Sequence, residues 1–277
     1  MKAIMEVSEK PGVARRLAVL IPVFNNPCGL RRTLASLEPE RPVFDIIVVD
    51  DGSRPPLPAA LCCGDHRVIM FRQNENAGIT GALNCGLNYV LSHPYSFVAR
   101  IDAGDTAIWG RMQKQMTFLE GHPKCGVVSS FADFVDTEGR FIHRHRAPMT
   151  HEKIMRQMHI NNCILHATAM IRVESLRVCG GYSDAFGVAG EDYELFLRMS
   201  KRYELAVIPE VLTNCEDSEL GISVANRKKQ QRARFNLQKA YFDPLLPHSY
   251  YGILRTLVAV RTPRALVLLY KRRLRTC

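Results

Sequence analysis

The chain of 277 residues lacks a long apolar run. Nowhere do about 18 apolar residues follow one another without interruption, which is the length that a membrane-spanning helix needs. Residues 1–14 also lack the apolar centre of a secretory signal peptide, so we interpret them as a loose leader. The hydrophobic share of 47% suffices for one large core, or for a core with a small subdomain. These features predict a cytoplasmic globular protein.

Cysteine is present nine times, but the spacing typical of zinc-binding or redox pairs is missing. The adjacent Cys62 and Cys63 lack the two-residue spacer that such sites favour. Most of the other thiols lie inside apolar segments, so we expect reduced core cysteines in a reducing compartment. These thiols are Cys28, Cys85, Cys125, Cys163 and Cys179.

Acidic side chains are absent from residues 244–277, where seven basic residues supply most of the formal net charge of +10. Apolar residues accompany them in two groups, at 253–260 and 266–269, separated by Pro263. Apolar faces flanked by arginines are typical of a helix on an anionic membrane surface, where each basic residue contributes about 1 kcal/mol. The alternative is a C-terminal helix that packs on the domain and keeps a solvated basic face.

A basic tail is also compatible with nucleic acid binding. The sequence contains no helix-turn-helix pattern, no RNA-binding aromatic motif and no zinc spacing to accompany the tail. We therefore expect no nucleic acid partner.

Two apolar runs of strand length, at 44–50 and 97–101, end in carboxylates. Such runs are typical of buried parallel strands, and ligands of open α/β sheets bind at the carboxyl ends of these strands. Acids at two such ends favour a ligand that carries a cation and hydroxyl groups. A nucleotide-sugar with a divalent metal fits this description.

The chain alternates between strand and helix patterns in its first half, which indicates a βαβ arrangement. We divide it into the leader 1–14, a first half at 15–125, a second half at 126–243 and the tail 244–277, with the boundary near 121–126 inside one structural unit. The expected strands are 17–24, 44–50, 67–71, 97–102, 126–135, 167–173 and 205–208, with a hairpin turn at 137–140, and the expected helices are 29–37, 79–92, 108–120, 151–159, 190–201 and 224–242.

Five motifs then follow in a fixed order along the chain. They are the strand 17–25, VVDDGS at 48–53, NAG at 76–78 with ALNCG at 82–86, the Asp102 cluster, and GEDYEL at 190–195. Over roughly residues 16–215 this order resembles the inverting family 2 glycosyltransferases of the GT-A fold. The resemblance implies an α/β chain with a Rossmann-like nucleotide-binding half (15–125) and a mixed-sheet, acceptor-binding catalytic half (126–243), here followed by basic amphipathic C-terminal helices.

The resemblance assigns Pro22 and Asp51 to the base and ribose pocket, where Asp51 accepts the N3–H of uracil or thymine. Asp50 is interpreted as structural, and the alternative for both acids is a simple Asx turn. Asn76, Gly78 and Asn84 are assigned to the donor, because glycine lets the backbone approach a nucleotide and a helix start offers N–H groups to phosphate. Alternatively, the glycines of this segment only allow close packing of helix and sheet.

The metal site is less regular than in the resembling family, whose usual string is Asp-x-Asp-Asp. This chain has Gly104 in the second acidic position, so only Asp102 and Asp105 remain. The resemblance implies that Asp102 contacts the ribose or the metal and that Asp105 contributes to a site for Mn²⁺ or Mg²⁺, ions that often use one or two protein carboxylates beside substrate phosphates. Alternatively, Asp105 only caps a following helix.

Glu191 and Asp192 begin an amphipathic helix, and by resemblance Asp192 is the base that deprotonates the acceptor hydroxyl. Glu191 is placed on the acceptor side, and the alternative for both acids is a favourable first-turn position in the helix dipole. His166 matches a histidine near the sugar site, or else it is a hydrogen-bonded core residue. The segment 231–235 resembles the Gln-x-x-Arg-Trp string of processive synthases with Phe in place of Trp, and we interpret it as the polar face of a helix.

We expect a cytoplasmic enzyme on the inner face of the cytoplasmic membrane. It would transfer one sugar from a UDP- or dTDP-sugar, with inversion, to a lipid-linked or lipopolysaccharide-type acceptor in bacterial surface glycan synthesis. One alternative is a sugar-phosphate nucleotidyltransferase, although its glycine-rich N-terminal phosphate loop is missing. The other is a catalytically inactive sugar-nucleotide-binding subunit, which Gly104 keeps open.

Overall fold

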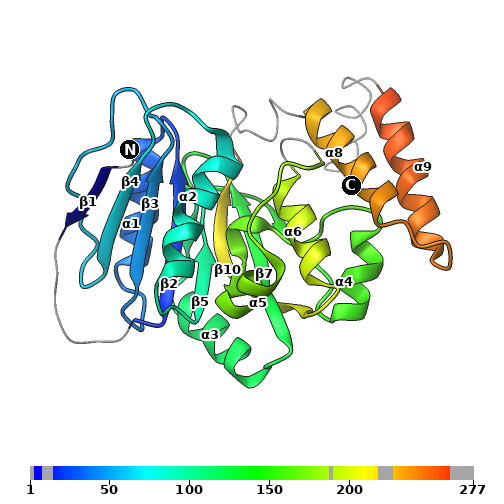
Figure 1. Cartoon of the computed structure of the whole chain (residues 1–277), viewed down its shortest axis with the longest axis horizontal. Coiled ribbons are helices and arrows are strands. Elements are labelled where there is room, and N and C mark those ends of the chain that lie inside the picture. The colour runs from blue at the N-terminus through cyan, green and yellow to red at the C-terminus, as the bar shows by residue number, and fades with distance from the viewer. Residues whose placement is uncertain (1–2, 8–14, 187–189, 218–226, 263–277) are drawn as a thin grey trace.

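The computed structural model describes residues 3–7, 15–186, 190–217 and 227–262, and its centre is one ten-stranded mixed sheet (Figure 1). Across the sheet the strands are β1 (Ala3–Val7), β4 (Arg67–Arg72), β3 (Asp45–Asp50), β2 (Leu17–Val23), β5 (Phe97–Arg100), β9 (Met170–Arg172), β7 (Cys125–Val135), β10 (Glu204–Glu216) and β6 (Thr106–Ala107). The short strand β8 (Phe141–His145) pairs with β7 outside this path.

Helices cover both faces of the sheet. One core contains side chains of α1 (Pro27–Leu37) and α3 (Arg111–Gly121). The other contains side chains of α2 (Gly78–Ser92), α4 (His151–Met158), α5 (Val173–Cys179), α6 (Glu191–Met199) and α8 (Arg227–Ala240). Helix α9 (Pro247–Arg261) packs on α8 at the end of the molecule far from β1 and β4 (Figure 1).

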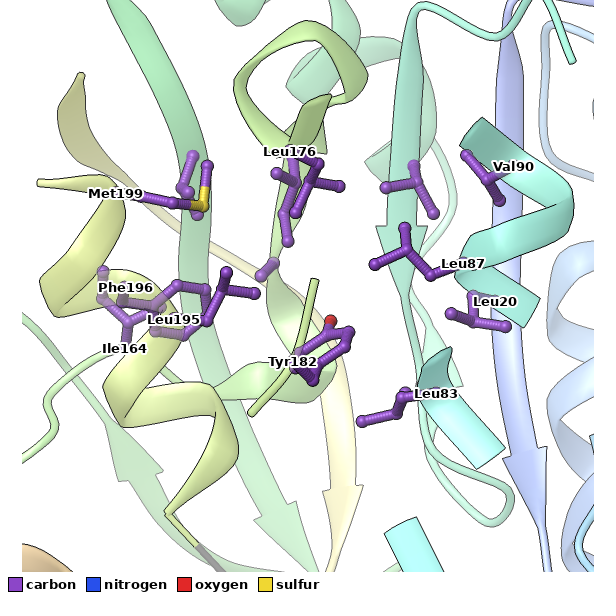
Figure 2. Packing of buried hydrophobic residues seen from close by; sticks show 14 of the residues in the cluster. Leu20, Leu83, Leu87, Val90, Ile164, Leu176, Tyr182, Leu195, Phe196 and Met199 are labelled. Carbon is purple, nitrogen blue, oxygen red and sulfur yellow. The ribbon is translucent and has the colours of Figure 1, made fainter. Parts of the chain in front are cut away.

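The central strands alternate between these two cores because successive side chains of a strand point to opposite faces. Leu20 and Ile47 belong to one core, whereas Ile21 and Ile46 belong to the other, and each is at most 1% exposed. Both faces of these strands are thus covered, which explains why they read as continuous apolar runs. Figure 2 shows Tyr182 between the side chains of α2 and those of α6, so one core joins the two halves of the chain.

The direction of the strands places several chain segments at one edge of the sheet. Strands β2, β3 and β5 are parallel, β9 is antiparallel to β5 and β7, and β10 is parallel to β7. The carboxyl ends of β2, β3, β5, β7 and β10 therefore face the same way. Segments 24–26, 51–53 and 102–105 and the end of β10 meet there, as open α/β sheets require of a ligand site.

Most elements lie where the sequence predicts, but three expectations in the middle of the chain differ from the structure. The expected short strand 205–208 is the 13-residue strand β10, in which register shifts near Ile208 and Val211 absorb the irregular backbone around Pro209. The expected helix 108–120 begins only at Arg111, since residues 106–107 form β6 and Gly110 adopts a left-handed backbone. Likewise the expected strand 167–173 divides into the 3-10 helix η1 (His166–Thr168) and β9.

The two ends of the chain also differ from expectation. Residues 3–7 of the expected loose leader form β1, an antiparallel edge strand on β4. In the tail, α9 is followed by residues 263–277, so the apolar group 266–269 lies outside the described residues. Cys28 is exposed instead of buried. Within the described part of the chain, no helix has both the length and the apolar character needed to cross a bilayer.

Candidate active site

Asp50, the last residue of β3, and Asp51 directly after it make different contacts. Asp50 is buried, and its Oδ1 accepts the backbone N–H of Ser53 at 2.9 Å while its other oxygen pairs with Arg72. Asp50 therefore makes the turn, as the structural interpretation expects. Asp51 reaches across to the next loop, because its Oδ1 accepts the N–H of Ala77 at 2.8 Å. Burial raises the pKa of Asp51, which is 4% exposed.

The end of β2 carries an aromatic side chain that sequence reasoning missed. Pro22 is buried within the strand, opposite Val49 of β3, whereas Phe24 directly after the strand is 48% exposed. Asn25 fixes this turn with a left-handed φ of 52°, and its N–H donates to Ser53 Oγ at 2.9 Å. An aromatic residue just beyond a buried strand is the sequence signal for such a position.

The 76–78 loop that opens α2 is ordered by its own side chains. Asn76 Oδ1 accepts the N–H of Gly78 at 3.0 Å, and Gly78, with a φ of +77°, has open space where a side chain would lie. Asn84 is predicted to contact the donor, but its side chain has protein partners. Its amide exchanges two hydrogen bonds with the backbone of Tyr182, at 2.9 and 3.0 Å, and so holds α2 to the segment after α5.

Asp102 lies at the end of β5 beside Arg100, a second residue that sequence reasoning missed. The Arg100 guanidinium donates to Asp102 Oδ1 and to the carbonyl of Ile101, while the Asp102 side chain remains 48% exposed. Arg100 is only 2% exposed, and its Nε has no partner among the described residues. Arg100 and Asp102 stand two apart in the expected strand 97–102, and residues two apart on a strand share a face, which was the available signal.

Asp105 points in the other direction, into the protein. Its Oδ1 accepts the backbone N–H of Glu216 at 2.9 Å, at the end of β10, and the Cys215 thiol also bonds to it. Burial, reinforced by the charge of Asp102, raises the pKa of Asp105 to about 7. The alternative that Asp105 caps a helix is wrong, because β6 follows it.

Glu191 and Asp192 form a pair of buried or half-buried acids at the start of α6. Asp192 accepts the N–H of Tyr193 at 2.7 Å on Oδ1 and the amide of Asn162 at 2.9 Å on Oδ2. Burial and the neighbouring Glu191 raise the pKa of Asp192 to about 7. Burial also raises the pKa of Glu191, whose Oε2 is buried and finds no hydrogen-bond partner in the described part of the chain.

His166 is hydrogen-bonded, as the second of the two interpretations expects. Its Nε2 lies 2.8 Å from the Tyr182 hydroxyl, and the two rings meet edge to face at 5.3 Å. Burial, together with the charge of Arg100, lowers the pKa of His166 well below its usual value. Burial raises the pKa of Tyr182, and the charges of Arg100, which lowers it, and of Asp192 and Asp102, which raise it, also act on this hydroxyl. The end of β5 and the start of α6 thus bring their charged groups to one site.

The described residues contain no large cluster of metal-binding side chains. There is no group of three or more His, Cys, Asp or Glu side chains able to hold a metal ion in that part of the chain.

The segment 231–235 lies on α8. Its Gln231 side chain donates to the carbonyl of Ala259 at 3.3 Å and thereby joins α8 to α9. This agrees with its interpretation as part of a helix surface.

Comparison with known proteins gives the same family as the motifs. The model of glycosyl transferase family 2 matches residues 18–180. The amylovoran biosynthesis glycosyltransferase AmsE of Erwinia amylovora is 26% identical over 273 residues, which cover 92% of this chain and 98% of that relative. The O-antigen biosynthesis glycosyltransferase WbnJ of Escherichia coli is 30% identical over 120 residues, which cover 43% of this chain and 46% of WbnJ.

Solved structures confirm the fold. S. aureus TarS 1-349 in complex with UDP-GlcNAc superposes with a TM-score of 0.63 and 15% identity, covering 87% of this chain and 71% of that one. The mannosyltransferase PcManGT of Pyrobaculum calidifontis, in complex with GDP-Man and Mn²⁺, gives a TM-score of 0.56 and 17% identity, with coverages of 92% and 72%. The GT-A fold is thus confirmed, and since the family model spans more than half of the sequence, this chain belongs to glycosyl transferase family 2.

Proposed function

We propose that the chain transfers a single sugar, with inversion, from a UDP- or dTDP-sugar to a lipid-linked or lipopolysaccharide-type acceptor in bacterial surface glycan synthesis. The relatives support the setting, because AmsE and WbnJ are named for amylovoran and O-antigen biosynthesis. The structural neighbours support the donor class, since TarS binds UDP-GlcNAc and PcManGT binds GDP-Man. The donor sugar and the linkage are not part of the proposal.

The observation that carries the proposal is the position of Asp192. Its pKa is raised to about 7, so at neutral pH a substantial fraction is ionised and still basic enough to take a proton. In the proposed reaction Asp192 accepts the proton of the acceptor hydroxyl as that oxygen attacks the anomeric carbon. The nucleoside diphosphate leaves from the opposite face, which inverts the configuration.

The donor half is proposed to be 15–125 and the acceptor half 126–243. Asp51 anchors the 76–78 loop, and Gly78 has open space where a side chain would lie. Base recognition by Asp51 and close approach of the donor at Gly78 are consistent with this geometry. Pro22 contributes as a buried part of β2 below this surface. Asn84 is better explained as a link between α2 and Tyr182 than as a donor ligand.

A divalent metal is proposed to accompany the donor. The half-exposed Asp102 has one oxygen outside its ion pair with Arg100, and a single carboxylate with diphosphate oxygens and water suits Mg²⁺ or Mn²⁺. Asp105 fits less well than the sequence suggests, because its carboxyl is buried against β10. When bound, the metal would neutralise the charge of the leaving diphosphate.

The proposed location is the inner face of the cytoplasmic membrane, with α9 as the contact. Tyr250, Tyr251, Leu254 and Val258 form one side of this helix, and each is 55–62% exposed. Arg255 and Arg261 are exposed on the same helix, and no acidic residue follows residue 243. Tyrosines, aliphatic side chains and arginines on one exposed helix suit the surface of an anionic bilayer.

The function is tested by incubating the purified chain with a panel of UDP- and dTDP-sugars and Mn²⁺, while measuring donor hydrolysis and transfer to lipid-linked acceptors. Transfer, or hydrolysis of one donor, supports the enzyme. Nucleotide binding without hydrolysis of any donor would instead identify an inactive sugar-nucleotide-binding subunit, which the replacement of an acid by Gly104 favours as the second candidate. Calorimetry with UDP and dTDP, with and without Mn²⁺, separates the two cases.

A further inference from the structure

The loop after β5 has a glycine, Gly104, where the family places a carboxylate. Gly104 adopts a φ of +119°, a backbone that L side chains rarely adopt, so an acid in this position would be strained. A Cβ built on Gly104 would lie 3.6 Å from Glu216 Oε2 and 3.6 Å from Asn26 Nδ2, with no closer neighbour. The space that the missing side chain would use is therefore faced by a carboxylate of another strand.

Glu216 is held at this place by its backbone. It is the last residue of β10, whose partner there is Val135 of β7, and its N–H donates to Asp105 Oδ1 at 2.9 Å. The buried Asp105 thus anchors the Glu216 peptide to the loop that carries Asp102. The Glu216 side chain itself is 18% exposed, and its Oε2 lies 3.6 Å from the place where a Gly104 Cβ would be.

The charge of Glu216 is balanced by one cation in the described structure. Arg32 of α1 forms an ion pair with Glu216 Oε2, and the Arg32 side chain is 46% exposed. Because the Arg32 side of this pair is open to solvent, screening weakens the pair. Arg32 can therefore move away from the carboxylate without disturbing the core.

We infer that Glu216 supplies the second carboxylate for the donor-bound divalent cation, in place of the acid that Gly104 replaces, and that Arg32 neutralises Glu216 when the cation is absent. This rests on the proposed function and on the metal that accompanies it. Asp102 and Glu216, together with diphosphate oxygens and water, make an all-oxygen set of the kind that Mg²⁺ and Mn²⁺ prefer.

The test is Mn²⁺ binding, measured by calorimetry and by the Mn²⁺ electron paramagnetic resonance signal, with UDP present. Glu216→Gln keeps the size of the side chain but removes its charge, so we expect Mn²⁺ affinity for the UDP complex to fall by about tenfold or more. UDP binding without metal should stay unchanged. Glu210→Gln is the matched control, because Glu210 also lies on β10, is 53% exposed and pairs with a surface lysine.

A second pair of variants tests the counter-ion. Arg32→Gln frees Glu216 from its ion pair, so Mn²⁺ affinity should rise about severalfold, whereas Arg31→Gln, one position away on α1 and also exposed, should leave it near the natural value. Thermal unfolding of each variant shows whether it is folded. Opposite effects of the Glu216 and Arg32 variants distinguish a metal ligand from a merely structural ion pair, whose loss would affect both variants alike.

Two results would overturn the inference. One is an unchanged Mn²⁺ affinity in folded Glu216→Gln, which would leave the proposed glycosyl transfer intact. The other is a natural chain that binds UDP but no Mn²⁺, which would remove the metal from the proposal as well. Transfer in excess EDTA, measured separately, then decides whether the proposed function survives without a cation.

Discussion

Asp192 is held at both carboxylate oxygens, by Asn162 and by its neighbour's backbone N–H, so its orientation is fixed before any acceptor arrives. Asp192→Asn keeps the size of the side chain and removes the proton acceptor. We expect transfer to fall by about 10²-fold or more, with UDP affinity little changed. Transfer kinetics and calorimetry measure the two effects. The control is Asp65→Asn, which should retain activity. Asp65 lies in a surface ion pair with Arg41, at 3.7 Å.

The same carboxyl predicts the pH dependence of the reaction. Burial and Glu191 raise the pKa of Asp192 to about 7, and only the ionised form can accept a proton. Transfer should therefore rise with pH through about 7, and the profile of kcat against pH should show this acidic limb. A rate that stays constant from pH 5.5 to 8.5 would exclude Asp192 as the group that limits the reaction.

A stability measurement gives an independent reading of this shift. A carboxyl with a pKa raised from 3.8 to about 7 binds its proton more tightly in the folded chain, so the folded state loses stability as pH rises through this interval. Asp192→Asn removes that loss. The melting temperature of the variant, minus that of the natural chain, should therefore be larger at pH 8 than at pH 5. If the difference in melting temperature between Asp192→Asn and the natural chain is the same at pH 5 and at pH 8, the raised pKa is contradicted.

The sequence predicts the candidate residues that belong to short local motifs. Asp51, Asp102 and Asp192 each follow or begin an element whose pattern is clear, and the parallel strands β3 and β5 carry the first two to one edge of the sheet. Glu216 was missed for a physical reason. Its position beside Asp105 depends on a loop more than 100 residues earlier, and no local pattern records such a contact.

At the scale of elements, α9 docks through a glycine. A Cβ on Gly252 would lie 2.1 Å from the carbonyl oxygen of His159, so the helix can approach α4 closely only without a side chain here. We expect Gly252→Ala to lower the free energy of unfolding by about 1–3 kcal/mol, the usual cost of overpacking. Urea unfolding measures this value, and Gly121→Ala, whose Cβ meets nothing within 4 Å, is the control.

The same contact predicts different outcomes for two truncations of the tail. Removal of residues 249–277 takes away Ser249, which hydrogen-bonds His159 at 2.9 Å, and should destabilise the fold. A chain that ends at Thr262 keeps all of α9 and should melt near the natural temperature. Circular dichroism of the two forms checks this difference, and equal melting curves would mean that α9 contributes nothing to the core.

Elements with regular periodicity were predicted well, whereas irregular ones were not. The parallel strands and α1, α2 and α6 follow continuous apolar or amphipathic patterns. Strand β10 does not, because Pro209 and Glu210 interrupt it and the bulges near them hide the continuation. Strand β9 is short and is fixed by its neighbours β5 and β7, which the local sequence does not specify.

For the whole molecule, the net charge of +10 and the exposed side of α9 predict how the chain distributes between solution and membrane. Leu254→Glu with Val258→Glu places two acids on that side without touching the buried face of α9. We expect sedimentation with anionic vesicles to fall severalfold, and the natural chain's binding to weaken as salt screens its charge. Neutral vesicles and the Glu152→Gln surface variant are the controls. Unaltered sedimentation of the double variant would exclude α9 as the contact.

The late position of β10 in the chain also has a consequence for synthesis on the ribosome. Strands β2 to β5 are complete by residue 100, whereas both sheet partners of β7 on the main path, β9 and β10, are translated after it. The nascent chain can therefore assemble its parallel strands early, but contacts between distant segments form late. The hydrogen bond from Glu216 to Asp105 forms only after residue 216 has emerged, so a chain released earlier would contain residues 15–125 with the 102–105 loop lacking this contact.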